Sequence, residues 1–440
     1  MIKDEQSLIY STKESKSKRI YFIITYMTLI YGALALRDIV GVAVPMILFS
    51  VITVVFALFG SISDIMAITC TLIPLISAVN LGTIVCLLSI VLAIKYVFLM
   101  HNRLSALFPL FLLPILFELY HIFTPPFFID SFLMLSGSYL CVGLLVCCTK
   151  IDIDYPLSLK SFILSLLIFS VLLVIVTLKD TGGSLVGLLS SSRRLGLTID
   201  STDTVAYKIS ANSNNLGNQC ALGICSCIAL ISGGVWKTRK FLLVASSIVL
   251  IGLLTQSRMF FITLLFILLF TVVTFRKMKK RVFSKKITRT IVLMLVLVCL
   301  VLIAFPDVLS NLIGRTNAQE VNPYFSRTNI MIGYLQYVFR DVSRVLFGIG
   351  TQAQEVKSGY GASTHNMILD VFVSWGLVGL VYGAVFFRKL IKYAGYKKGA
   401  PYELLAVFTL LLMTQSGRFF RSTTAIMMLI PVVSYIKIIK

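Results

Sequence analysis

The chain has 440 residues, of which 58% are hydrophobic and only 13% are charged. A soluble protein of this size carries about 25% charged residues because its surface faces water, so the composition excludes an ordinary soluble domain and indicates a membrane protein. The formal net charge of +22 would suggest a nucleic-acid partner in a soluble protein, but here membrane topology explains it and we expect no nucleic-acid partner.

Apolar stretches recur along the whole chain. A helix that crosses a bilayer needs about 20 apolar residues, and about 14 stretches reach or approach this length. They predict an all-α, polytopic membrane helix bundle in which residues 1–440 form a single integral membrane domain. The stretches lie near residues 20–36, 39–59, 62–79, 81–100, 104–123, 127–148, 160–178, 215–235, 240–255, 259–275, 290–306, 367–387, 403–416 and 422–438.

The basic residues predict the orientation of these spans. If the N-terminus lies in the cytoplasm and the spans alternate, 27 of the 40 basic residues fall in cytoplasmic segments. This bias is what the positive-inside rule requires, and it supports an even number of spans with both termini in the cytoplasm. The same alternation predicts two long outer loops, at 179–214 and 307–366.

The basic residues assigned to the outside are mostly arginine. The inside set has 20 Lys and 7 Arg, whereas the outside set has 3 Lys and 10 Arg. A guanidinium is a permanently charged fork that matches phosphate and carboxylate, so the outer face is predicted to hold an anion. The alternative is that these arginines snorkel or pair with outer acids such as Asp341. The ten are Arg37, Arg193, Arg194, Arg258, Arg315, Arg327, Arg340, Arg344, Arg418 and Arg421.

The second outer loop contains a segment with helical periodicity. Within 329–347, apolar residues recur at Ile330, Tyr334, Val338, Val342 and Val345. This spacing predicts an amphipathic helix that lies on the outer membrane surface. The sequence FGIG at 347–350 is expected to end it.

Among the three histidines, His365 lies where the second outer loop meets the predicted span 367–387. Ser363 or Thr364 can cap that helix, whose N-terminus disfavours a charged imidazole and leaves His365 able to accept a proton. The alternative is a passive surface histidine. Asp370 lies in the span itself, where an acid is usually functional or makes a helix–helix hydrogen bond.

His121 and Arg258 each allow two interpretations. His121 follows Glu118 by three residues, and the two could share a structural hydrogen bond. Arg258 opens the predicted span 259–275, where an arginine either binds an anion or snorkels to the interface. The sequence lacks a Walker A motif, a paired outer carboxylate, a GxSxG motif and a Rossmann fingerprint. We therefore expect no metal, no cofactor and no nucleotide-driven transport.

Four segments together resemble the bacterial O-antigen polymerase and O-antigen ligase superfamily. Their order, spacing and topology are similar to that family over about 180–390. The segments are NSNNLGNQCALG at 212–223, TQSRMFFITLLFILL at 255–269, YFSRTNIMIGYLQYVFRDVSRVLFGIGTQAQE at 324–355 and STHNMILDVFVSWGLVGLVYG at 363–383.

This resemblance implies transfer of glycan from undecaprenyl diphosphate to an acceptor hydroxyl at the outer face of the bacterial inner (plasma) membrane. It implies that His365 is the general base and that Arg258 neutralises the diphosphate leaving group. By the same resemblance Arg327, with Arg193 or Arg194, holds the diphosphate or acidic sugars. Tyr324 and Asn366, which lie in the same motifs, are expected to bind substrate.

Four functions remain open, of which a cell-wall polymerase of the shape-and-division type is the most distant. A polymerase, which the predicted spans and outer loops favour, uses a lipid-linked oligosaccharide as donor and as acceptor. A ligase transfers the glycan to lipid A-core. A flippase should carry charges deep in several spans, whereas the charges here gather at the two faces. Expected partners are the lipid-linked glycan, membrane lipid, a chain-length regulator and a flippase.

Overall fold

The computed structural model describes ten stretches of the chain and six single residues. Within them every regular element is a helix, which agrees with the all-α class predicted from the sequence. The stretches are 2–76, 78–96, 104–123, 126–148, 153–181, 211–277, 327–352, 354–359, 366–394 and 419–439, and the single residues are Leu195, Ile209, Val296, Leu300, Ile303 and Thr364.

The helices follow the apolar stretches closely. They are α1 (Ile2–Ala35), η1 (Leu36–Val40), α2 (Met46–Phe59), α3 (Ile62–Leu72), η2 (Ile73–Leu75), α4 (Leu81–Ile94), α5 (Pro109–Tyr120), η4 (His121–Phe123), α6 (Ile129–Val146), α7 (Tyr155–Thr181), α9 (Ser213–Ser232), α10 (Thr238–Leu254), α11 (Arg258–Lys277), α14 (Arg327–Phe339), α15 (Val342–Phe347), α16 (Gln354–Ser358), α17 (Met367–Ala394), η6 (Phe419–Arg421), α19 (Thr423–Met427) and α20 (Leu429–Ile439).

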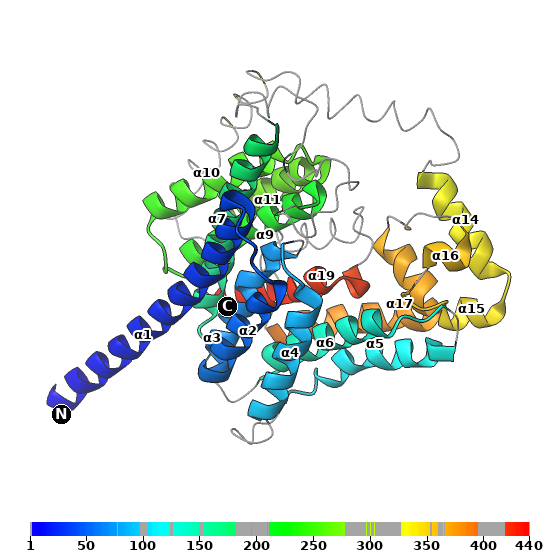
Figure 1. Cartoon of the computed structure of the whole chain (residues 1–440), viewed down its shortest axis with the longest axis horizontal. Helices are drawn as coiled ribbons and strands as arrows, with labels where there is room; N and C mark the ends of the chain where they lie inside the picture. The colour runs from blue at the N-terminus through cyan, green and yellow to red at the C-terminus, as the bar shows by residue number, and fades with distance from the viewer. Residues whose placement is uncertain are drawn as a thin grey trace.

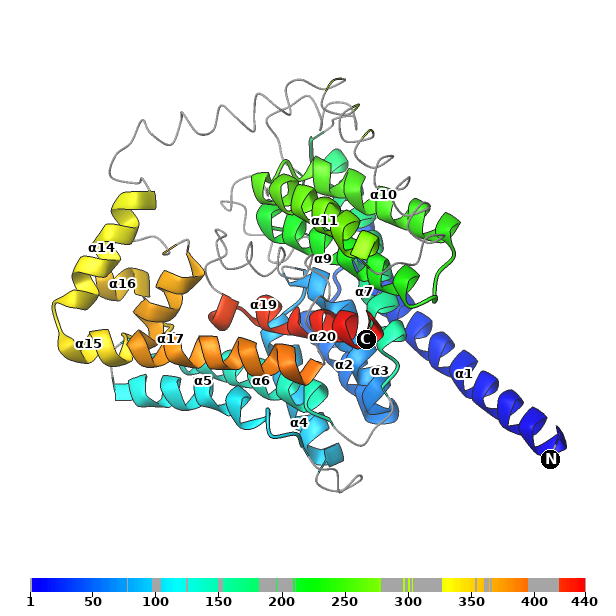
Figure 2. The same cartoon turned by 180° about the vertical axis from the view of Figure 1, so that it is seen from behind.

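The helices pack into a body with one projecting arm and one lateral group. In Figures 1 and 2 the N-terminal part of α1 extends away from the other helices, and α14, α15 and α16 gather at the opposite edge beside α17. Within the body α3 packs on α7, α4 on α6, and α9 on α10 and α11, while α20 contacts both α7 and α9. Two hydrophobic clusters result, a large one through the body and a small one between α14 and α17.

Five helices are long and apolar enough to cross a membrane: Ser17–Val40, Ile129–Val146, Tyr155–Lys179, Ser213–Ser232 and Met367–Tyr393. Shorter apolar helices accompany them, and large apolar side chains such as Phe59, Leu243 and Val381 point outward. Exposed apolar side chains of this kind suit contact with lipid. These helices indicate a multi-pass membrane protein. The count of about 14 spans and their orientation stay predictions.

Two of the predicted spans cannot be compared with the structure. The stretch 403–416 lies outside the described residues, and within 290–306 only Val296, Leu300 and Ile303 are described. The stretch 39–59 begins later than predicted, because Gly41 has a left-handed backbone with φ 90° and Pro45 immediately precedes α2.

The predicted amphipathic helix is present as two helices, α14 and α15. Ile330, Tyr334 and Val338 are buried in the small cluster, as the periodicity predicted, but Val342 is 75% exposed. The chain breaks before Val342 because Asp341 adopts extended backbone and its Oδ1 accepts a hydrogen bond from the N–H of Ser343 at 2.9 Å. This new N-cap starts a second helix in a different phase.

A break inside α17 shapes the region around the site. Gly376 has φ 64° and ψ −154°, so the helix is interrupted there and the carbonyls of Val373 and Ser374 are free to accept other hydrogen bonds. The N–H groups of Ile349 and Gly350 donate to these two carbonyls at 2.9 and 2.8 Å. Irregular backbone inside a membrane bundle is tolerated where protein groups satisfy it in this way.

Candidate active site

The segment around His365 is held by its neighbours. His365 lies outside the described residues, but Thr364 is fully buried and its Oγ1 lies 3.3 Å from Oδ1 of Asp370. Asn366 accepts two backbone N–H groups, that of Leu369 on Oδ1 at 3.0 Å and that of Asp370 on its carbonyl at 2.8 Å. Asn366 therefore caps α17, and the cap predicted at Ser363 or Thr364 is wrong for Thr364, whose hydroxyl faces Asp370.

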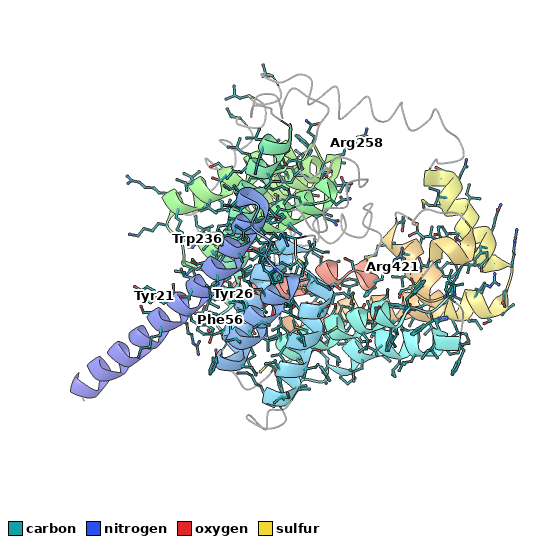
Figure 3. All side chains as sticks on the ribbon, in the orientation of Figure 1. Tyr21, Tyr26, Phe56, Trp236, Arg258 and Arg421 are labelled. Carbon is teal, nitrogen blue, oxygen red and sulfur yellow. The ribbon has the colours of Figure 1, made fainter. Side chains whose placement is uncertain are left out.

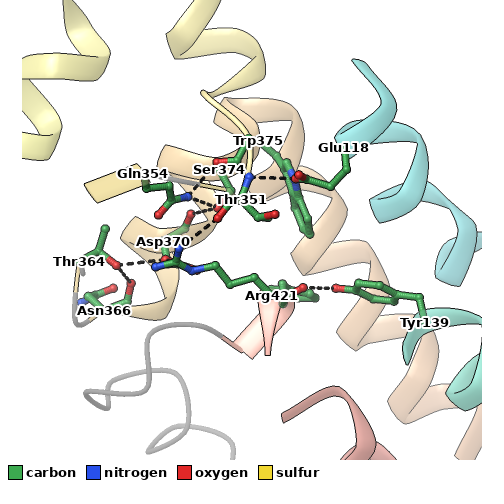
Figure 4. A network of polar contacts seen from close by, with 12 residues as sticks. Glu118, Tyr139, Thr351, Gln354, Thr364, Asn366, Asp370, Ser374, Trp375 and Arg421 are labelled. Atoms are coloured by element: carbon green, nitrogen blue, oxygen red, sulfur yellow. Dashed lines mark hydrogen bonds and ion pairs between the residues drawn. The ribbon is translucent and has the colours of Figure 1, made fainter. Parts of the chain in front are cut away.

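Asp370 forms a buried ion pair with Arg421. Nε of Arg421 lies 3.2 Å from Oδ1 of Asp370, and the two side chains are 9% and 2% exposed. Nη1 of Arg421 also donates to the carbonyl of Thr351 at 3.0 Å. Figure 4 shows how this guanidinium joins α17, the segment after α15, and η6. An arginine fork is suited to donating to several acceptors at once because its N–H groups point in fixed directions.

Glu118 connects α5 to the same segment. Its Oε1 accepts a hydrogen bond from the N–H of Thr351 at 2.9 Å and another from Nε1 of Trp375 at 2.7 Å. His121 Nε2 lies 3.1 Å from the carbonyl oxygen of Phe347. The suggested Glu118–His121 hydrogen bond is therefore replaced by three separate ones, and the two residues hold the end of α15 and the segment that follows it.

Two side chains close this docking segment. Gln354 is buried, and its Nε2 donates to the carbonyl of Gly350 at 3.0 Å and to Oγ of Ser374 at 2.6 Å. Nζ of Lys357 donates to the carbonyl of Ile349 at 2.8 Å. Burial lowers the pKa of Lys357, and the nearby Glu118 carboxylate opposes that shift. The segment 347–358 is thus fixed along its described length.

Arg258 begins α11 after a tight turn. Gln256 has φ 47°, a left-handed conformation that is uncommon for a residue other than glycine. Oγ of Ser257 donates to Oδ1 of Asn214 at 3.1 Å, and the N–H of Phe260 donates to that hydroxyl at 3.4 Å. The TQSR and NSNN motifs therefore touch, and α9 packs closely on the TQSR turn, because a Cβ on Gly217 would lie 3.0 Å from Cβ of Ser257.

The guanidinium of Arg258 is incompletely paired within the described part of the chain. Its Nη2 is buried and has no hydrogen-bond partner there. In Figure 3 Arg258 lies on the side of the α9–α11 group where α14 to α17 lie. A buried guanidinium nitrogen without an acceptor is costly, and an anionic ligand would satisfy it.

The remaining predicted site residues are placed only in part. Arg193, Arg194 and Tyr324 lie outside the described residues, and Arg327 begins α14 with its side chain undescribed. Leu195, directly after Arg194, is fully buried, and its N–H donates to the carbonyl of Leu254 at 3.1 Å. This bond fixes the residue after the arginine pair against the end of α10.

The sequence does not predict the partners of two residues of this site. It places Arg421 among the outer arginines and pairs Glu118 with His121, because no local pattern reports a contact with α17. A signal was available for Glu118, since a carboxylate inside the apolar helix α5 requires hydrogen-bond donors from elsewhere.

The comparisons with known proteins agree with three of the four motifs, because NSNNLGNQCALG at 212–223 lies almost wholly before the matched residues. Residues 222–382 match the family model described as O-antigen ligase, and no curated protein matches the chain. The matched region holds Arg258, Thr351 and Asp370 and ends before Arg421. This match supports membership of the O-antigen polymerase and ligase superfamily, whose glycosyltransferase-like members act on lipid-linked glycans in a membrane.

Proposed function

We propose that the chain is a polysaccharide polymerase. It transfers a glycan from undecaprenyl diphosphate to a hydroxyl of a second lipid-linked repeat unit at the outer face of the plasma membrane. The observation that carries this proposal is the buried Nη2 of Arg258, which has no hydrogen-bond partner in the described part of the chain. Arg258 also begins α11, so its guanidinium stands beside the positive end of a helix dipole.

A diphosphate is the anion that this arrangement suits. Guanidinium groups and helix N-termini both bind phosphate oxygens, and diphosphate needs more than one such group to spread its charge. The hydrogen bond from the Leu195 N–H to the Leu254 carbonyl supports a role for Arg193 or Arg194. It attaches Leu195, the residue directly after this pair, to Leu254, which precedes Arg258 by four residues. Arg327 is proposed to complete the set from the start of α14.

His365 is proposed as the general base. The acceptor oxygen bonds to the anomeric carbon of the donor, its proton passes to His365, and the bond from that carbon to the diphosphate oxygen breaks with its electron pair on the leaving group. Arginines that hold the diphosphate stabilise this developing charge. Asn366 and Tyr324 are proposed to position the sugars. In this scheme protein side chains supply all the catalytic groups.

A ligase that transfers the glycan to lipid A-core is the second candidate. The description of the matching family model, O-antigen ligase, favours it. Both enzymes would use the same donor and leaving group, so Arg258 and His365 would have the same roles. The two functions differ only in the acceptor.

The acceptor therefore decides the test. The purified protein would be placed in lipid nanodiscs and given the lipid-linked repeat unit from the producing cell, with or without lipid A-core. A ladder of longer lipid-linked glycans in the absence of lipid A-core supports the polymerase, whereas transfer that requires lipid A-core assigns the ligase. His365→Ala should abolish transfer while the protein remains folded in the nanodisc, and a wild-type rate in that variant would overturn the proposed base.

A further inference from the structure

The Asp370–Arg421 ion pair holds both chain neighbours of His365. Oδ1 of Asp370 lies 3.3 Å from Oγ1 of Thr364, on one side, and the Asp370 N–H donates to the carbonyl of Asn366 at 2.8 Å, on the other. The residues before and after position 365 are thus connected to one aspartate in the first turn of α17.

Arg421 stands on a rigid support. The hydroxyl of Tyr139 in α6 donates to the carbonyl of Phe420 at 2.7 Å, and Oγ of Ser138 donates to Oγ1 of Thr423 at 3.0 Å. The ring of Phe420 packs at 5.8 Å from that of Trp375. Residues on both sides of Arg421 are thereby attached to α6, one through its backbone and one through its side chain, which helps to place the guanidinium relative to α17.

Burying the Asp370–Arg421 ion pair costs desolvation free energy. Removing two ions from water costs more than an ordinary hydrogen bond returns, and apolar residues of similar volume often stabilise a fold as well or better. In some proteins a buried ion pair defines one geometry, since its donors and acceptors permit few arrangements. Here the arrangement joins Thr351 of the segment after α15 to the start of α17.

We propose that Asp370 and Arg421 are positioning residues for glycan transfer. The pair sets the first turn of α17 against η6 and so places His365 relative to the acceptor hydroxyl. Arg421 lies beyond the region matched by the family model, so this role extends the site into the C-terminal helices. The inference rests on the proposed function, because it takes His365 as the base.

The test compares four variants in the nanodisc assay: Asp370→Asn, Arg421→Gln, Arg421→Lys and the double variant Asp370→Asn/Arg421→Gln. Each single loss of charge should lower kcat about a hundredfold, because a small misplacement of a catalytic group costs about that much. KM for the lipid-linked unit should stay within about twofold, since the diphosphate arginines are untouched. Arg421→Lys should recover part of the rate by restoring the charge.

The double variant should be no slower than the slower single variant, because the two residues act as one unit. Asp341→Asn is the matched control. It makes the same change of acid to amide in an exposed pair, where Oδ2 of Asp341 lies 3.7 Å from Nε of Arg344, and it keeps a residue able to cap α15. Its kcat should equal that of the wild type.

Three outcomes would overturn the inference. They are a wild-type kcat in Asp370→Asn and Arg421→Gln, a raised KM with unchanged kcat, or a loss of folded protein that accounts for all lost activity. If His365→Ala is inactive while the pair variants are fully active, only this inference fails. If His365→Ala is fully active, the proposed function fails at its base, whatever the pair variants do.

Discussion

Glu118 and Trp375 are 257 residues apart in the chain, yet Oε1 of the acid accepts a hydrogen bond of 2.7 Å from the indole Nε1. The same oxygen accepts the N–H of Thr351. Two elements distant in sequence, α17 and the segment after α15, are therefore attached to α5 by a single carboxylate oxygen.

Replacing Glu118 should destabilise the protein according to whether an acceptor remains. Glu118→Leu leaves two buried N–H groups without a partner, at about 1–3 kcal/mol each. Glu118→Gln keeps an oxygen in the Oε1 position and should cost less. Thermal unfolding of both variants in detergent measures the difference, and an equal loss of stability would show that the two hydrogen bonds contribute nothing.

Gly348 and Gly376 should not tolerate alanine. A Cβ on Gly348 would lie 2.3 Å from the carbonyl of Ser374, and one on Gly376 would lie 2.3 Å from the carbonyl carbon of Leu346. Both glycines also have positive φ, so either substitution should lower the yield of folded protein severely. Gly383→Ala on the same helix is the control, because its Cβ would meet Phe420 at an ordinary 3.8 Å. Fluorescence-detected size-exclusion chromatography compares the yields, and a normal monodisperse peak for Gly376→Ala would refute this prediction.

Arg258→Lys should lose most of its transfer activity although the positive charge remains. Lysine carries a point charge and cannot present two parallel donors to a diphosphate, so we expect a fall in kcat/KM of at least about tenfold, or about 1.4 kcal/mol. Initial rates of glycan transfer by folded protein measure this. Full activity in Arg258→Lys would show that the residue only snorkels.

The contact between Ser257 and Asn214 should appear as energetic coupling. Ser257→Ala and Asn214→Ala each remove one partner of the 3.1 Å hydrogen bond between α9 and the turn before α11. In a double-mutant cycle on thermal stability, the two losses should overlap by about 0.5–1.5 kcal/mol. Strictly additive losses would mean that the two motifs are adjacent without supporting one another.

The sequence predicted the parts of the fold that depend on local pattern. Apolar stretches marked the helices, and helical periodicity identified the buried stripe of Ile330, Tyr334 and Val338. The same periodicity missed the break at Asp341, because the capping hydrogen bond to Ser343 competes with helix continuation and leaves no trace in hydrophobicity. Local pattern also identified Gly348 and Gly350 as the end of this helical region.

Long-range pairings were beyond that reasoning. The sequence identifies Asp370 as an intramembrane acid and Arg421 as one of ten outer arginines, but which arginine meets which acid depends on how α17 packs against η6. One amino-acid sequence by itself contains no signal that identifies which arginine pairs with Asp370. The candidate catalytic residues themselves rest on the family motifs, and the structure adds the neighbours that hold Thr364, Asn366 and Arg258.

The two consecutive hydrogen bonds from Ile349 and Gly350 to Val373 and Ser374 set a register between the segment after α15 and the interrupted helix. One residue inserted between Gly348 and Thr351 would shift that register and withdraw Thr351 from Glu118 and Arg421 together. The length of this short stretch is therefore as important for the structure as the identity of any side chain in it.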